Sequence, residues 1–217
     1  MITAQVMDVA LTAFVTMFVI IDPLGLLPIF MGLTQDAPAA HKRKMAVKGV
    51  LIGGATLLFF AFLGDKFLGL LGVNIASFRI AGGAMLFVTA LEMVFEKRTQ
   101  RRESGATKMK QEIDADSAFD DISVFPISIP LISGPGAIAS IMLLMSANRD
   151  NVVHMATVLI VLVFVLLIVF CLFMMAHRLE KLMGPTFTQI VSRVLGVILG
   201  ALAVQYIVDG LRATFMT

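Results

Sequence analysis

Apolar residues run in long stretches along this chain instead of alternating with polar ones. A window of about 19 residues finds six such stretches, at 6–31, 47–64, 76–95, 122–146, 152–176 and 190–211. A helix needs about 20 apolar residues to cross the hydrocarbon core of a bilayer, so the pattern predicts six transmembrane helices. A membrane β-barrel would show shorter segments of alternating polarity, which residues 152–176 do not.

Composition agrees with a membrane protein and excludes a soluble globule. Of the 217 residues, 59% are hydrophobic and 15% are charged, whereas soluble domains are about 45–50% apolar and about 25% charged. The net charge is only +2, so the lipid bilayer is the expected partner and no nucleic acid is expected. A single cysteine, Cys171, excludes a disulfide framework and a cysteine-based metal site.

Most cations flank the same ends of the predicted helices. Thirteen of the 17 Lys and Arg fall on one side, namely Lys42, Arg43, Lys44, Lys48, Lys97, Arg98, Arg101, Arg102, Lys108, Lys110, Arg178, Lys181 and Arg193. Cytoplasmic flanks carry an excess of Lys and Arg, so this side is expected to be the cytoplasm, with both termini outside. The first stretch lacks the features of a cleavable signal and is expected to be retained.

The predicted helices form two groups of three within a single membrane domain. Residues 1–95 hold the first group, residues 96–121 form a charged cytoplasmic loop, and residues 122–217 hold the second group. The loop is expected to be solvated and partly disordered because of its composition. Since each group holds an odd number of helices, the two groups are expected to lie in opposite senses across the bilayer.

Matching residues in the two groups suggest a duplication followed by inversion. Pro23 and Pro135 are 112 positions apart, and Arg79 and Arg193 are 114 positions apart. Each pair alone is a weak signal, but both occur in the same order at nearly one offset. The predicted fold is therefore all-α, with two inverted three-helix repeats, as in many secondary transporters.

Proline and glycine interrupt the first and fourth predicted helices near their middles, at 22–28 and 130–136. Proline removes a helical hydrogen bond and clashes with the preceding turn, so both helices are expected to be broken at membrane depth. Freed backbone groups cannot face lipid, and paired breaks in matching positions point to a transport site. The alternative is a pair of structural kinks that bind no ligand.

Four stretches resemble the signature sequences of the MarC family. They are IDPLGLLPIF at 21–30, FRIAGG at 78–83, ALEM at 90–93 and IPLISGPGAI at 129–138. The resemblance implies a six-span protein of the bacterial or archaeal inner membrane. It also implies transport of small neutral amino acids, which is the activity described for SnatA-like members.

The helix breaks define the candidate substrate site. Each half-helix that follows a break begins near the middle of the membrane, and its N-terminus favours an anion. Asp22 is expected to cap one of these ends, so the other is expected to take a substrate carboxylate while Asp22 faces the substrate ammonium, a proton or a sodium ion. Glycines would let a small ligand approach the backbone. The predicted substrate-binding residues are Asp22, Pro23, Gly25, Pro28, Ser133, Gly134, Pro135 and Gly136.

Arg79 and Glu92 are further ionisable residues, in the third predicted helix. They lie about 20 Å apart along a helix axis and cannot pair with each other. One interpretation is a gate or an ion-coupling role, and the other is snorkelling to the membrane interface. Gln205, Tyr206 and Asp209 raise the same question in the last helix.

These observations favour a secondary transporter of small neutral amino acids, of the glycine and alanine class, coupled to a proton or sodium gradient. An exporter of drugs or other small metabolites and a non-transporting scaffold or channel are the alternatives. An enzyme is not expected, because converging catalytic groups are missing, and neither is a metal or another cofactor. The spacings Gly49-x-x-x-Gly53 and Gly196-x-x-x-Gly200 are interpreted as helix packing, and a homo-oligomer formed through a small-residue face is a further prediction.

Overall fold

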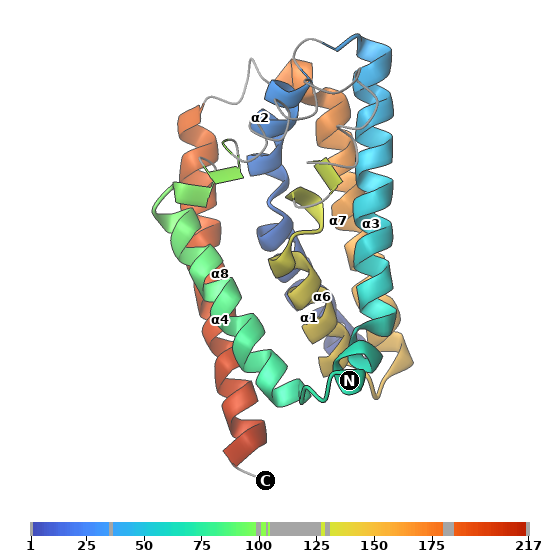
Figure 1. The fold of residues 1–217 in the computed structure, drawn as a ribbon, viewed down its shortest axis with the longest axis vertical. Coiled ribbons are helices and arrows are strands. Elements are labelled where there is room, and N and C mark those ends of the chain that lie inside the picture. The colour runs from blue at the N-terminus through green and yellow to red at the C-terminus, as the bar shows by residue number, and fades with distance from the viewer. Residues whose placement is uncertain are drawn as a thin grey trace.

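The computed structural model describes residues 2–34, 37–98, 101–102, 104, 127–128, 131–179 and 185–215. In these ranges the regular structure is helical (Figure 1). The helices are α1 (Ile2–Ile21), α2 (Pro23–Leu33), α3 (Ala39–Leu70), α4 (Ile75–Val94), α6 (Pro135–Ala147), α7 (Val152–Leu179) and α8 (Pro185–Phe215). Most of the predicted charged loop, residues 96–121, lies outside the described residues.

Five segments of the described chain are long and apolar enough to cross a membrane, namely Ala4–Leu33, Ala39–Leu70, Ile75–Val94, Val152–Ala176 and Thr188–Phe215. The fourth predicted helix, 122–146, is represented among the described residues by α6, whose 13 residues extend about 20 Å, too short to cross a core of about 30 Å alone. The prediction of an all-helical membrane protein is confirmed.

The helices run alternately between the two ends of the bundle (Figure 1). From the end that carries both termini, α1 runs to the middle and α2 continues to the opposite end. There the chain turns back along α3 and then returns along α4. Helix α6 starts in the middle and runs toward the termini, whereas α7 and α8 cross the full length in opposite directions.

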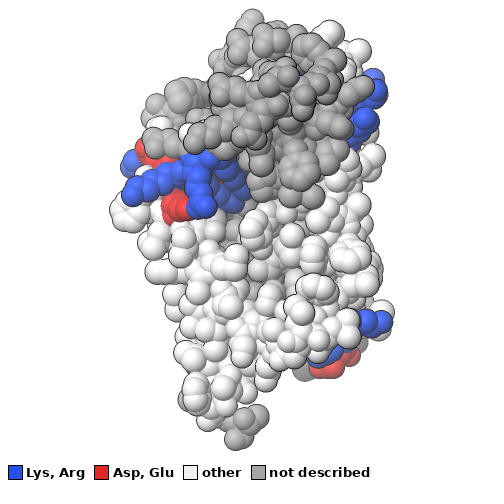
Figure 2. Space-filling model, viewed as in Figure 1, with Lys and Arg blue, Asp and Glu red and all other residues white. Residues whose placement is uncertain are grey.

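On the face shown in Figure 2 the middle of the bundle carries no charged residue, and the charges gather toward its ends. Large side chains such as Phe62 on α3, Phe164 on α7 and Val197 on α8 are more than half exposed. A soluble monomer rarely exposes so much contiguous apolar surface, so this surface is suited to lipid. Cations concentrate at the end where α3 begins and α4 ends, as the sequence pattern predicted.

Small residues let α4 and α8 pack closely along their length. A Cβ added at Gly83 would lie 2.8 Å from the carbonyl oxygen of Ala203, and one added at Gly196 would lie 2.9 Å from the Cβ of Met93. Both distances are shorter than real Cβ contacts, so only glycine fits this backbone arrangement. The packing interpretation of Gly196 is therefore confirmed.

The other small-residue spacing also packs inside the chain. A Cβ added at Gly53 would lie 2.8 Å from Cγ2 of Ile132, and the Ser128 hydroxyl donates a 2.9 Å hydrogen bond to the Gly49 carbonyl. Helix α3 is thereby held against the segment that precedes α6. Since both spacings serve contacts within one chain, a homo-oligomer would need a different surface.

We expect Gly83→Ala to lower the free energy of unfolding by about 1–3 kcal/mol, because the added methyl group would force α4 and α8 apart. Thermal unfolding of the purified protein in detergent measures the effect. The matched control is Gly69→Ala in α3, where no atom lies within 4 Å of an added Cβ. Equal stability of the two variants would contradict the close packing of α4 and α8.

Candidate functional site

The first helix break lies at Asp22, between α1 and α2. Asp22 has a left-handed backbone, with φ 58° and ψ 65°, a conformation that a residue other than glycine seldom adopts. Pro23 follows as the first residue of α2 and has no N–H with which to continue α1. The break predicted from the proline pattern is confirmed, and the Asp22 side chain is buried there.

Asp22 caps the second half of this broken helix. Its Oδ1 accepts a 3.1 Å hydrogen bond from the Gly25 N–H, which satisfies one of the free donors at the start of α2. A Cβ added at Gly25 would lie only 2.3 Å from Oδ2 of Asp22. Gly25 therefore makes room for the capping carboxylate, and the close approach of a ligand to its backbone stays a prediction.

The second break lies at Gly134, just before α6. The backbone N–H and the hydroxyl of Ser133 both donate to the Ser128 carbonyl, at 3.0 and 2.9 Å, so the Ser133 hydroxyl serves a local contact. Gly134 is extended, with φ −66° and ψ 167°, and no side chain of the described residues caps the start of α6 at Pro135. The predicted difference between a capped α2 and an uncapped α6 is confirmed, while Pro130 lies outside the described residues.

The two breaks are in contact with each other. A Cβ added at Gly136 would lie 3.0 Å from Cδ1 of Ile20, so the first turn of α6 packs beside the end of α1. From this level α2 and α6 run to opposite ends of the bundle (Figure 1). The positive ends of two helix dipoles thus lie in the middle of the bundle, and Gly136 is a packing contact.

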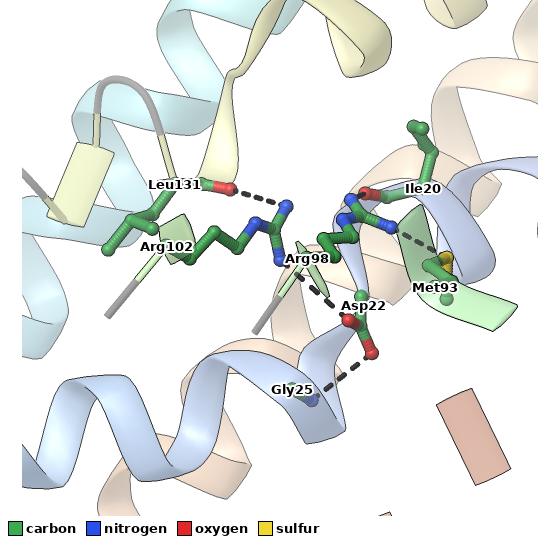
Figure 3. Close-up of polar contacts among 7 residues, drawn as sticks. All are labelled: Ile20, Asp22, Gly25, Met93, Arg98, Arg102 and Leu131. Carbon is green, nitrogen blue, oxygen red and sulfur yellow. Dashed lines mark hydrogen bonds and ion pairs between the residues drawn. The ribbon is translucent and has the colours of Figure 1, made fainter. Parts of the chain in front are cut away.

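Arg98 caps the end of α1 and is buried in the site, contrary to the prediction of a solvated loop cation. Its guanidinium donates to the Ile20 carbonyl and to the sulfur of Met93 (Figure 3), and only 6% of the residue is exposed. The last carbonyls of a helix lack helical partners and form its negative end. A cation at this position donates hydrogen bonds to the free carbonyls and balances the negative end of the helix.

Arg102 connects the first break to the second. Its Nη2 lies 3.5 Å from the carbonyl oxygen of Leu131, three residues before Gly134, and its Nη1 lies 3.8 Å from Oδ2 of Asp22 (Figure 3). The side chain is 16% exposed. Arg98 and Arg102 therefore each approach a carbonyl next to a different break, and we call these two arginines with Asp22 the central site.

Among the described residues, the central site itself has an excess of positive charge, with two guanidiniums and one carboxylate, while Glu92 acts on both guanidiniums as a further negative charge outside it. Burial lowers the pKa of Arg102 to about 9, and the neighbouring charge of Arg98 acts in the same direction. Burial also lowers the pKa of Arg98, against the opposing effect of Asp22. With a pKa of about 9, the Arg102 guanidinium is protonated at neutral pH, so it attracts an anion.

Sequence reasoning missed these two arginines, although one signal was present. Residues four apart share one face of a helix, and 98 and 102 are helical in the described chain. Arg101 points elsewhere: its side chain is 77% exposed and pairs with Glu92 at 2.6 Å. Spacing alone cannot tell which face of a charge-rich segment is buried.

The remaining predicted site residues lie away from the two breaks. Pro28 is half-buried within α2, and Glu92 pairs with Arg101. Arg79 packs against α8, where a Cβ added at Gly210 would lie 3.2 Å from its Cβ. A gate or coupling role for Arg79 and Glu92 stays a prediction. Within the described ranges, no three His, Cys, Asp or Glu residues are grouped closely enough to hold a metal ion.

Apolar helices of membrane-spanning length, one of them interrupted at the buried Asp22, define a multi-pass membrane protein with a polar centre. The chain belongs to the MarC family of integral membrane proteins, whose family model matches residues 7–215.

Several curated relatives are similar over nearly their whole length. A UPF0056 membrane protein of Archaeoglobus fulgidus is 34% identical, and the match covers 92% of this chain and 90% of the relative. One from Methanocaldococcus jannaschii is 32% identical, over 94% and 96% of the two chains. The UPF0056 membrane protein YhcE of Escherichia coli is 30% identical, over 93% and 91%. No solved structure matches this chain.

We expect Gly25→Ala to displace the Asp22 carboxylate and to destabilise the protein by about 0.5–2 kcal/mol, the usual cost of losing a helix cap. Gly32→Ala, in the same helix, is the control, because no atom lies within 4 Å of an added Cβ there. Thermal unfolding in detergent compares the two variants. A Gly25→Ala protein as stable as its control would show that the cap is dispensable.

Proposed function

We propose that this protein is a secondary transporter that moves small neutral amino acids, of the glycine and alanine class, across the inner membrane. The observation that supports this function best is the central site itself. Two helices break at the same level of the bundle, and their second halves leave in opposite directions around the buried Asp22. Transporters use such discontinuous helices to bind charged substrate groups at membrane depth.

The charges of the central site suit a zwitterion. A substrate carboxylate is attracted by the positive excess and by the uncapped start of α6. Asp22 supplies the negative charge that an ammonium group, a proton or a sodium ion requires. Because the apolar residues next to the breaks, such as Ile20, Leu131 and Ile132, are buried, a small side chain is favoured. The same charges favour a small polar substrate over a large apolar drug.

The contacts between helices support alternating access by two inverted halves. Exchange of the halves replaces α2 by α6, α3 by α7 and α4 by α8. Under this exchange the contact of α2 with α7 becomes that of α6 with α3, and the contact of α2 with α8 becomes that of α6 with α4; all four contacts occur. Exchanged helices also run in opposite directions (Figure 1). Rocking of one half against the other would expose the central site to each side in turn.

We expect gradient-driven uptake of labelled glycine or alanine into proteoliposomes, and a loss of about tenfold or more in Asp22→Asn, which corresponds to about 1.4 kcal/mol. Asparagine can still cap α2, so folding should be preserved while the charge is removed. Gly134→Leu should also abolish uptake, because its side chain would fill the space before α6. Proton and sodium gradients, applied separately, identify the coupling ion.

Two control variants address the same chemistry away from the central site. Asp150→Asn removes an exposed carboxylate, and Gly32→Leu adds a side chain where nothing lies within 4 Å of an added Cβ. Both should transport like the native chain. Failure of the native chain to take up either amino acid under any gradient would overturn the proposed substrate class.

The orientation of the chain can be tested on one helix. Lys44 and Lys66 are exposed near opposite ends of α3. In a Cys171→Ser background, we expect a membrane-impermeant maleimide to label Lys66→Cys on intact cells and Lys44→Cys only after the cells are opened. The background variant is needed because Cys171 is exposed. The opposite labelling pattern would place the cation-rich end outside.

A further inference from the structure

Arg102 is held more loosely than the other charged groups of the central site. Arg98 donates to two partners, and Asp22 accepts from the start of α2. By contrast, Arg102 has one long hydrogen bond of 3.5 Å to Leu131. Its Nη1 is buried without a hydrogen-bond partner among the described residues, since the 3.8 Å separation from Asp22 exceeds the usual length of about 2.7–2.9 Å for such a pair.

A buried guanidinium is energetically costly when one of its N–H groups donates to no acceptor. The free energy would improve if an acceptor with a negative charge came within hydrogen-bond distance of Nη1. A carboxylate fits best, because its two oxygens match the planar fork of a guanidinium. The net positive charge of the central site favours the same ligand group.

We propose that Arg102 binds the carboxylate group of the transported molecule, so that a ligand must carry a carboxylate to enter the central site. This inference rests on the proposed function and names the group that the site recognises. Arg98 acts as a positioning residue, because its guanidinium is committed to Ile20 and Met93. A ligand carboxylate competes with Asp22 for Arg102, which frees Asp22 to receive the ammonium group or the coupling cation.

Binding to the purified full-length protein tests the ligand requirement without transport. Labelled glycine and labelled acetate serve as probes in a scintillation proximity assay, with unlabelled glycine, acetate, glycinamide and methylamine as competitors. We expect glycine and acetate to compete, whereas glycinamide and methylamine do not, because they lack the carboxylate. Glycinamide competing as well as glycine would overturn the inference.

Substitutions test whether carboxylate binding depends on the guanidinium of Arg102. Arg102→Gln should weaken binding of both probes about tenfold or more, and Arg102→Lys should bind with intermediate affinity because it keeps the charge but loses the fork. The matched control is Arg101→Gln, one position away, whose exposed side chain pairs with Glu92 and whose loss should leave binding unchanged. If Arg102→Gln does not fold, the competitor series on the native chain still tests whether a ligand must carry a carboxylate.

The outcomes separate this inference from the proposed function. Acetate binding that depends on Arg102, together with no transport of glycine or alanine, would support the carboxylate site and overturn the amino-acid substrate. If the native protein transports glycine and Arg102→Gln binds glycine with unchanged affinity, the proposed function is supported. The carboxylate-binding role of Arg102 is then overturned. Native protein that binds neither probe would also overturn it.

Discussion

A helix that is interrupted inside an apolar bundle leaves backbone donors and acceptors, and two opposite dipole ends, where no bulk water can satisfy them. The rest of this structure depends on how that problem is solved. Asp22 supplies the anion at the start of α2, and Arg98 supplies the cation at the end of α1. The buried charges are therefore required by the break itself.

The helix pairs around the breaks have different mechanical roles. Helices α4 and α8 pack through glycines so closely that an added methyl group would meet backbone atoms, which gives the bundle a stiff outer pair. The short half α2 is held instead by its cap at Asp22 and by side-chain packing such as the stacked rings of Phe30 and Phe173. The uncapped half α6 is held by side-chain packing against α3. Shorter helices with fewer close backbone contacts are the parts that can shift without disrupting the bundle.

How far the sequence predicts this structure depends on the range of the interactions involved. The breaks at Asp22 and Gly134 and the capping role of Asp22 follow from local rules about proline and helix ends, and they were predictable. The burial of Arg98 depends on Ile20, which is 78 positions away, so no local sequence pattern predicts it. The space that Gly25 leaves for the Asp22 side chain was not predictable either, since it depends on the direction in which that side chain points.

The two arginines belong to neither group of three helices. They reach the central site from the segment that joins the groups, and they do so from the end of the bundle at which α4 stops. A site shared equally by two inverted halves would present the same chemistry to both faces of the membrane. In the proposed transporter these two guanidiniums would come from the joining segment alone, so the inward-facing and outward-facing forms would differ in their affinity for the ligand. The gradients would still set the direction of net transport.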